Sequence, residues 1–144
     1  GGAARHLRHI TLHVPLTPET HHMIDSLAVD KMKDGVMLIN TCRGKVVDTR
    51  AVLQGLKKGK IGYLGLDVYE EEDNIFYRDL SDKVIADEMI AQLIMMPNVV
   101  VTAHQAYFTE EALDSIARTT LDNISSFEAG QRTGNEVHPE KHKK

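Results

Sequence analysis

Short apolar runs rich in β-branched residues alternate along this chain with segments of helical spacing. Four such runs predict β-strands, near residues 10–14, 36–39, 61–68 and 98–101. The intervening segments carry apolar residues at helical spacing behind polar residues that can cap a helix. Because alternation of strands and helices is typical of βαβ units, the sequence predicts an α/β fold with one parallel sheet.

Helix starts are indicated by short polar residues. The helices are expected to begin at Ser26, Thr49, Asp87 and Thr109. The first would bury Leu27, Val29 and Met32, and the last would end at Gly130. The second would turn inward the apolar residues Ala51, Val52, Leu53 and Leu56.

Size and composition exclude several classes of protein. A chain of 144 residues has room for one domain with a real core. The net charge of −4, with both signs interspersed, argues against a nucleic-acid partner, because phosphate binding needs clustered Lys and Arg. The single cysteine excludes an internal disulfide and fits a reducing compartment. No apolar run approaches the ~20 residues of a membrane span, so we expect a cytoplasmic protein without a membrane partner.

Three of the predicted strands end in residues that carry chemistry. Arg43 follows the second run, Glu70, Glu71 and Glu72 follow the third, and His104 follows the fourth. Ligands of open α/β sheets collect at the carboxyl ends of the strands, which lie along one edge when the strands are parallel. An arginine, a carboxylate and an imidazole at this edge are the components of an acid/base site with an anion clamp.

Each of these residues also has a structural explanation. An arginine after a strand can pin a loop, an acidic run is usually solvated, and a histidine after a buried strand often bonds a backbone carbonyl. The short polar residues around Arg43 favour a ligand there, whereas the pattern alone does not choose among the three glutamates. His21 and His22 lack a partner at metal-ligand spacing, so we interpret them as surface histidines and expect no metal site.

Several stretches of the chain match a known pattern. They are His13–Thr17, Ile39–Gly44 with Val47 and Asp48 behind it, Gly65–Glu70, and Thr102–Ala106 with Thr109, Glu110 and Ala112 behind it. These stretches resemble the D-2-hydroxyacid dehydrogenase family, and the last is similar to its fermentative D-lactate dehydrogenase branch. The resemblance runs from about Ile10 to Val137 and implies the second half of a Rossmann-type NAD-binding domain.

The resemblance also implies roles for individual residues. The family's substrate-binding arginine falls on Arg43, its histidine on His104, and the glutamate paired with that histidine on Glu72. The positions that would line the nicotinamide and its ribose are Val14, Pro15, Thr20, Thr41, Cys42, Arg43 and Asp67. The choice of Glu72 over its neighbours comes from the resemblance alone.

The same resemblance suggests how the chain is organised. Residues 1–9 do not resemble the family, residues 10–130 correspond to a partial NAD-binding domain with a returning helix, and residues 131–144 form a tail. No Gly-x-Gly-x-x-Gly stands between a strand and a helix, so the phosphate cradle of a dinucleotide fold is absent from this chain.

The function implied is that of part of an NAD-dependent D-lactate dehydrogenase, which reduces pyruvate with NADH. The full protein is expected to be a homo-oligomer, and the isolated chain to be inactive. One alternative is another D-2-hydroxyacid dehydrogenase acting on a bulkier keto acid. The other is a non-catalytic scaffold or dimerisation module, since half a sheet exposes an edge strand that invites pairing.

Overall fold

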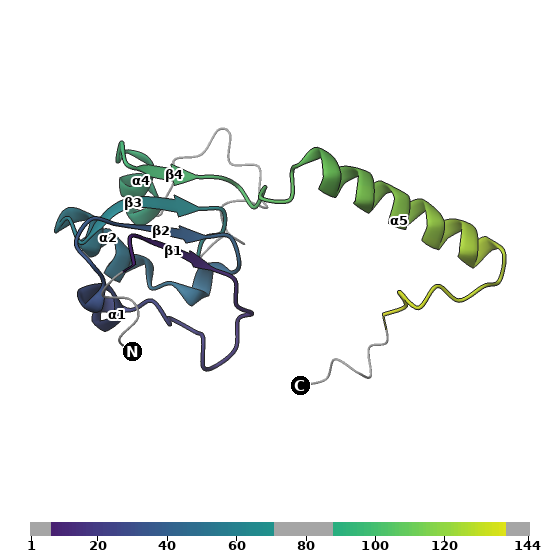
Figure 1. Cartoon of the computed structure of the whole chain (residues 1–144), viewed down its shortest axis with the longest axis horizontal. Coiled ribbons are helices and arrows are strands. Elements are labelled where there is room, and N and C mark those ends of the chain that lie inside the picture. Colours follow the sequence, from purple (N-terminus) through teal and green to yellow (C-terminus); the bar gives the residue numbers. More distant parts are fainter. Residues whose placement is uncertain (1–6, 71–87, 138–144) are drawn as a thin grey trace. The chain divides into compact units, whose positions relative to one another are not determined.

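The computed structural model describes residues 7–70 and 88–137, which fall into two compact units divided after Ala106. The first unit contains, in chain order, β1 (His9–Leu12), α1 (Ser26–Lys31), β2 (Val36–Asn40), the 3₁₀ helix η2 (Gly44–Val46), α2 (Thr49–Lys57), β3 (Ile61–Leu66), α4 (Glu88–Ile94) and β4 (Val99–Val101) (Figure 1). The second unit contains α5 (Glu110–Glu128).

The four strands form one parallel sheet in the order β1-β2-β3-β4, as the alternation of strands and helices predicts. Two strands end earlier than expected, β1 at Leu12 and β3 at Leu66. Leu12 pairs with Asn40, Asn40 with Leu66, and Leu66 with Val101. All four strands therefore end on one rung, and the last bonds between strands run from the N–H groups of Asp67 and Thr102 to the Asn40 and Leu66 carbonyls.

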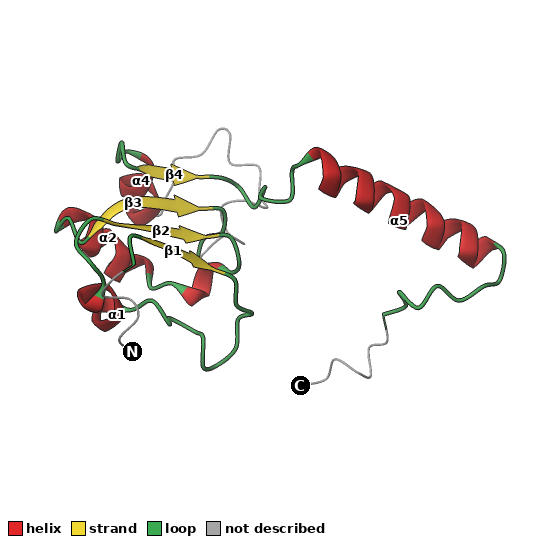
Figure 2. Cartoon of the chain, viewed as in Figure 1, coloured by secondary structure: helices red, strands yellow, loops and turns green. Residues whose placement is uncertain are grey.

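The core of the first unit lies between this sheet and its helices (Figure 2). Helix α2 contacts both α1 and α4, and α2 and α4 also contact strands. The largest fully buried apolar side chains include Val36, Leu38, Val46, Val52, Ile61, Ile90 and Leu93. Alternate residues of the strands point to the other face, where Tyr63 and Val100 are 58% and 65% exposed. The described helices of this unit thus bury one face of the sheet.

The caps of α1 and α2 lie one residue earlier than the sequence predicts. Asp25, not Ser26, caps α1 by accepting a hydrogen bond from the backbone N–H of Ala28 at 2.7 Å. Asp48, not Thr49, caps α2, with its carboxylate accepting from two backbone N–H groups of the first turn. In both cases the aspartate has extended backbone and supplies the acceptor that a helix start lacks.

Two further expectations about the helices have different outcomes. Leu27 of α1 is 64% exposed, so the prediction that it belongs to the buried face is wrong, whereas Val29 and Met32 are buried. The buried face of α2 is confirmed. Asp87, the expected start of α4, lies outside the described residues.

Helix α5 begins as the sequence predicts. Thr109 caps it by accepting from the Ala112 N–H at 3.2 Å, and Gly130 follows its end with φ of 68°. None of its residues is buried, and its apolar side chains Leu113, Ile116, Leu121, Ile124 and Phe127 are exposed. Across the described part of the chain, every helix is too short or too polar to cross a membrane.

The difference between buried and exposed leucines gives a test of this core. Leu38 is fully buried in the middle of β2, so Leu38→Ala should lower the free energy of unfolding by about 2–5 kcal/mol. Leu27→Ala removes the same atoms from an exposed position and should cost under about 0.5 kcal/mol. Urea denaturation of the full chain measures both, and equal losses would contradict the burial described.

Candidate functional site

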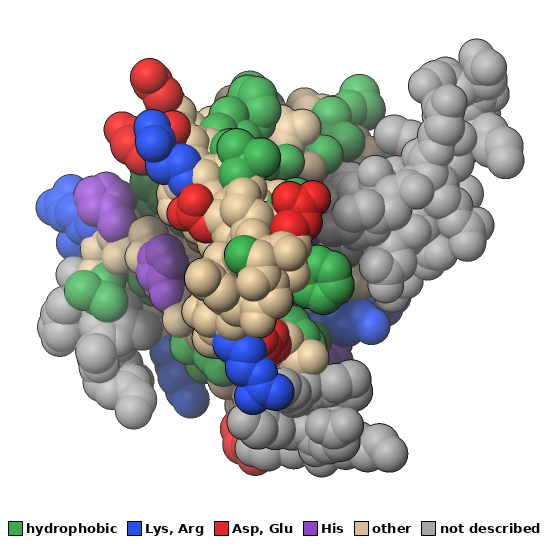
Figure 3. Space-filling model, turned by 90° about the vertical axis from the view of Figure 1, so that its right-hand side faces the viewer, with side chains coloured by type: hydrophobic (Ala, Val, Ile, Leu, Met, Phe, Trp, Pro, Cys, Tyr) green, Lys and Arg blue, Asp and Glu red, His purple; other side chains and the backbone are tan. Residues whose placement is uncertain are grey.

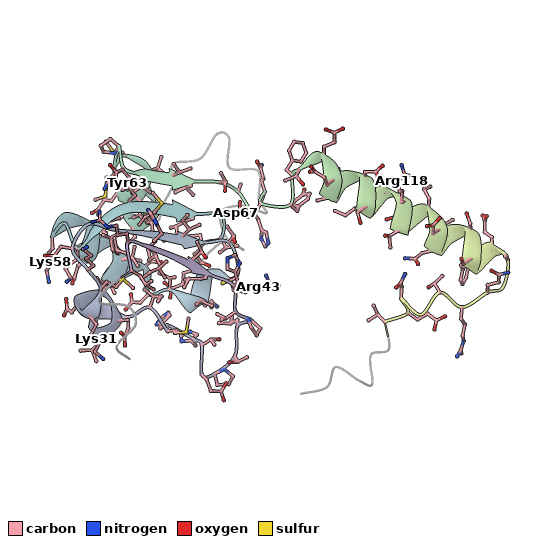
Figure 4. The ribbon with its side chains drawn as sticks, viewed as in Figure 1. Lys31, Arg43, Lys58, Tyr63, Asp67 and Arg118 are labelled. Atoms are coloured by element: carbon pink, nitrogen blue, oxygen red, sulfur yellow. The ribbon has the colours of Figure 1, made fainter. Side chains whose placement is uncertain are left out.

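The common last rung of the sheet determines where the polar residues of the site lie. His13, Thr41, Asp67 and Thr102 each come directly after a strand. Figure 4 shows Arg43 and Asp67 at this carboxyl edge, where the strands end. The edge is the one at which the sequence predicts a ligand site.

The turn that carries Arg43 is held by a buried asparagine. Asn40 is 1% exposed, and its side-chain amide donates to the Arg43 carbonyl at 2.9 Å. Its side-chain carbonyl accepts from the Cys42 N–H at 3.1 Å, and the Cys42 Sγ lies 3.0 Å away. The Arg43 side chain remains exposed and donates from Nη1 to the Cys42 carbonyl at 2.6 Å. Sequence reasoning missed this role of Asn40, although an asparagine that ends a strand before a turn is a usable signal.

Gly44 allows the Arg43 turn to touch the chain that follows β3. A Cβ atom added at Gly44 would lie 2.0 Å from the carbonyl oxygen of Tyr69 and 2.6 Å from the Glu70 nitrogen. Only a residue without a side chain permits this approach. The backbone contact fixes the spacing between the ends of β2 and β3.

The segment after β4, which carries His104, is folded around Asp67. The Asp67 carboxylate, 4% exposed, accepts from the Thr102 hydroxyl and from the backbone N–H groups of Gln105 and Ala106 at 2.7 and 2.9 Å. The Asp67 carbonyl accepts from the His104 N–H at 2.7 Å. His104 has φ of 55°, a left-handed conformation that is uncommon for a residue with a side chain. Asp67 therefore sets the turn that places His104 at the edge.

The same contacts determine the ionisation of Asp67. Burial raises the pKa of its carboxyl, but the hydrogen bonds from Thr102, Ala106 and Gln105 outweigh burial, and His104 adds a smaller favourable charge interaction. The net result is a pKa below the ordinary aspartate value. Asp67 is thus an anion in the folded protein over the neutral range.

A cavity of about 450 Å³ opens between the segment after β1 and the Arg43 turn. It is lined by His13, Val14, Pro15, Leu16, Thr41, Cys42 and Arg43. Five of the seven positions assigned to the cofactor by resemblance thus share one cavity. The other two positions are Thr20 and Asp67. The Thr20 hydroxyl donates to the carbonyl of the cavity residue Pro15 at 2.6 Å, and Asp67 follows β3, the strand next to β2. His13 and Leu16 also line the cavity; they lie in the stretch His13–Thr17 that carries the resemblance, but the sequence reasoning does not assign them individually to the cofactor.

The three glutamates after β3 do not behave alike. Both Glu70 oxygens are engaged, one by His22 Nε2 at 2.7 Å and the other by the Thr49 N–H at 3.2 Å. Glu71 and Glu72 lie outside the described residues, so the pairing of Glu72 with His104 stays a prediction. His22, predicted to be a surface histidine, keeps its side chain 34% exposed and also contacts Glu70, a partner that the sequence does not indicate.

Metal ligands and clusters of charge would mark further sites in the described part of the chain. Within residues 7–70 and 88–137, no group of His, Cys, Asp and Glu side chains is arranged to hold a metal ion. On the surface shown in Figure 3, acidic and basic side chains lie interspersed with apolar ones. The carboxyl edge of the sheet is therefore the candidate functional site.

Comparison with known proteins agrees with this geometry. Residues 3–106 match the family model described as the D-isomer specific 2-hydroxyacid dehydrogenase, NAD binding domain. The chain is 48% identical over 128 residues to a D-lactate dehydrogenase of Escherichia coli, a match that covers 89% of this chain and 39% of that enzyme.

Solved structures show the same fold. A D-lactate dehydrogenase with NAD⁺ from Lactobacillus jensenii superposes with a TM-score of 0.85 at 33% identity, covering 94% of this chain and 41% of that one. A D-2-hydroxyisocaproate dehydrogenase superposes with a TM-score of 0.83 at 34% identity, covering 93% and 41%. The chain spans about two fifths of the length of the relatives that it matches.

Gly44 provides a test of the contact between the strand ends. Gly44→Ala places a Cβ against the Tyr69 backbone and should lower the free energy of unfolding by about 1–3 kcal/mol or more. Gly65→Ala is the matched control, because its Cβ would lie 3.6 Å from the Ile39 side chain, an ordinary contact. Urea denaturation compares the two variants, and a harmless Gly44→Ala would show that the strand ends are not in contact.

Asp67 should make the stability of the chain depend on pH. Because its folded pKa lies below the ordinary aspartate value, its charge stabilises the fold above that value, about 3.9. This contribution is lost as the pH falls through the folded pKa. The difference in unfolding free energy between the parent and Asp67→Asn should therefore shrink from pH 6 toward pH 2.

Asp30→Asn, at an exposed position of α1, is the control for this pH series and should follow the parent at every pH. A gap between the parent and Asp67→Asn that is the same at pH 6 and pH 2 would mean that the charge of Asp67 contributes nothing.

Proposed function

The chain belongs to the D-isomer specific 2-hydroxyacid dehydrogenase family, as part of its NAD-binding domain, and from this premise we propose that it is part of an NAD-dependent D-lactate dehydrogenase. The observation that carries the proposal is that Arg43 and His104 follow strands that end on one rung, and that Arg43 also lines the cavity formed by residues 13–16 and 41–43. The homology to a D-lactate dehydrogenase supports lactate and pyruvate as the substrate pair.

The cavity suits the nicotinamide half of the cofactor. Its walls combine apolar Val14, Pro15 and Leu16 with polar groups of Thr41 and Arg43, as a ring with a carboxamide requires. The chemistry that bound NAD supplies there is hydride transfer. The pyrophosphate cradle has no counterpart in this sequence, so the cavity accounts for only part of the cofactor.

Arg43 is proposed as the group that holds the substrate carboxylate. Its guanidinium is exposed at the carboxyl edge, and its planar fork of donors matches a carboxylate. The buried Asn40 and the glycine behind Arg43 fix the turn from which it extends. A rigid turn with an exposed charge is what an anion clamp needs.

His104 is proposed as the acid and base of the reaction. When protonated, its imidazole donates to the carbonyl oxygen of the keto acid, and when neutral it accepts the hydroxyl proton in the reverse direction. Glu72 is proposed to bond the other ring nitrogen and to stabilise the charged ring. The contacts of Glu70 support the choice of Glu72 over Glu70, because both oxygens of the Glu70 carboxylate already accept hydrogen bonds, from His22 and from the Thr49 N–H.

A chimera tests the proposal. Replacing the matching region of the E. coli D-lactate dehydrogenase with this chain should give an enzyme that oxidises NADH on addition of pyruvate and forms D-lactate. The isolated chain should bind NADH poorly and show little turnover, since the relatives are more than twice as long. A folded chimera that turns over neither pyruvate nor a larger keto acid would favour the non-catalytic alternative.

The second candidate is a dehydrogenase for a bulkier keto acid, because a D-2-hydroxyisocaproate dehydrogenase shares the fold as closely as the D-lactate enzymes do. Assays of the chimera with pyruvate and with 2-ketoisocaproate distinguish the two, although the partner region of the chimera contributes to the preference. A chimera of this chain with the D-2-hydroxyisocaproate enzyme removes that bias.

Arg43→Lys in the active chimera should damage catalysis far more than its conserved charge suggests. A lysine ammonium cannot make the fork contact with a carboxylate, so we expect KM for pyruvate to rise and kcat to fall. Arg50→Lys, at an exposed position of α2, should leave both unchanged. An unaltered KM for pyruvate in Arg43→Lys would remove Arg43 from the role of clamp.

A further inference from the structure

One ion pair joins two segments that are far apart in the sequence. His22 Nε2 lies 2.7 Å from Glu70 Oε1, across 48 positions. The second Glu70 oxygen accepts from the Thr49 N–H at 3.2 Å. The His22 and Glu70 side chains are 34% and 21% exposed, so the pair is partly shielded from water. It connects the segment after β1, the end of β3 and the start of α2.

The segment after β1, residues 13–23, forms one wall of the cavity and has few attachments to the rest of the fold. Thr20 closes a turn within it by bonding Pro15 and Thr17. Its far end is tied down by the His22 N–H, which donates to the Lys45 carbonyl at 2.8 Å. His22 has φ of 50°, so the chain turns through a left-handed conformation at the residue that makes the ion pair.

We propose that His22 and Glu70 form a latch that positions segment 13–23 against the Arg43 turn and thereby sets the opening of the cavity. The inference rests on the proposed function in one respect, since it makes both residues positioning residues for the cofactor side of that site. Neither residue lines the cavity itself. The latch acts through the His22 backbone and through Glu70, whose nitrogen lies against Gly44.

Capping of α2 accounts for only one of the two Glu70 oxygens. Asp48 caps that helix through Oδ1, which accepts from the N–H groups of Arg50 and Ala51 at 2.9 and 3.1 Å. Glu70 Oε2 accepts from the Thr49 N–H, the first donor of the helix, and this bond fixes the orientation of the carboxylate. The other oxygen, Oε1, is the one that connects the end of β3 to His22.

The surroundings of Glu70 determine the pH range in which its carboxylate is ionised. Burial raises the pKa of Glu70, but the hydrogen bonds from Thr49 and His22 outweigh burial and leave the pKa below its ordinary value. The neighbouring titratable groups are His21, whose ring stacks on His22 at 4.0 Å, and Asp48 of α2. With its folded pKa lowered, Glu70 is ionised above the ordinary glutamate value, about 4.3, and its contribution to the latch is lost as the pH falls through the folded pKa.

Amide hydrogen exchange followed by NMR on the full chain tests the latch. Glu70→Gln should increase the opening of the His22 and Ile24 amides about tenfold or more, because a charged hydrogen bond is lost. The amides of Leu64 and Thr102, in the sheet and beyond its last rung, should change less than about twofold. Asp30→Asn is the control and should leave all four amides unchanged.

Two further arms separate a latch from general stabilisation. His22→Ala should increase the exchange of the same amides, and the double variant should increase it no more than either single change, since both changes remove one interaction.

The second test is the pH dependence. In the parent the extra protection of these amides should fade as Glu70 becomes protonated, whereas in Glu70→Gln their protection should not change over that pH range. Uniform loosening of the whole chain, additive effects or no change at His22 would each overturn the latch. Because the readout needs neither NADH nor pyruvate, an inactive chimera leaves it interpretable.

Discussion

The hydrogen-bond ladder of the sheet stops on a single rung, and the rest of the site depends on that termination. Leu12, Asn40, Leu66 and Val101 pair across all four strands, and no strand continues beyond them. Directly past this rung the N–H groups of Asp67 and Thr102 still donate to the Asn40 and Leu66 carbonyls, and the backbone groups farther along need other partners. Where they find them decides which side chains are presented at the carboxyl edge.

Two buried polar side chains supply those partners. Asn40 takes over from the ladder at the end of β2, and Asp67 does so for the chain after β4. In each case one side chain satisfies several backbone groups at once, and the residue presented to solvent is a different one. The support and the chemistry are thus carried by separate residues, which is how a functional group can stay exposed without being loosely held.

The sequence predicts the parallel sheet and the edge at which Arg43 and His104 lie, because both follow from patterns that are local along the chain. Helix caps are predicted to within one residue, since Asp25 and Asp48 stand beside the chosen Ser26 and Thr49. The partnership of Glu70 with a histidine 48 positions away is beyond such reasoning. It depends on how three segments converge in space, and no spacing along the chain encodes that. The choice of Glu72 came from resemblance and concerns a residue outside the described part.

The order of the strands has a consequence for how this sheet assembles. Every strand of the described sheet pairs with its neighbour along the chain, so each pairing requires closure of a single connection. The entropy of loop closure grows only slowly with the length of the connection, so each such closure is modest in cost. Assembly can therefore proceed strand by strand, with each added unit extending an existing template. Such a topology lowers the contact order of an otherwise slow-folding parallel architecture and allows a partly synthesised chain to begin forming its sheet.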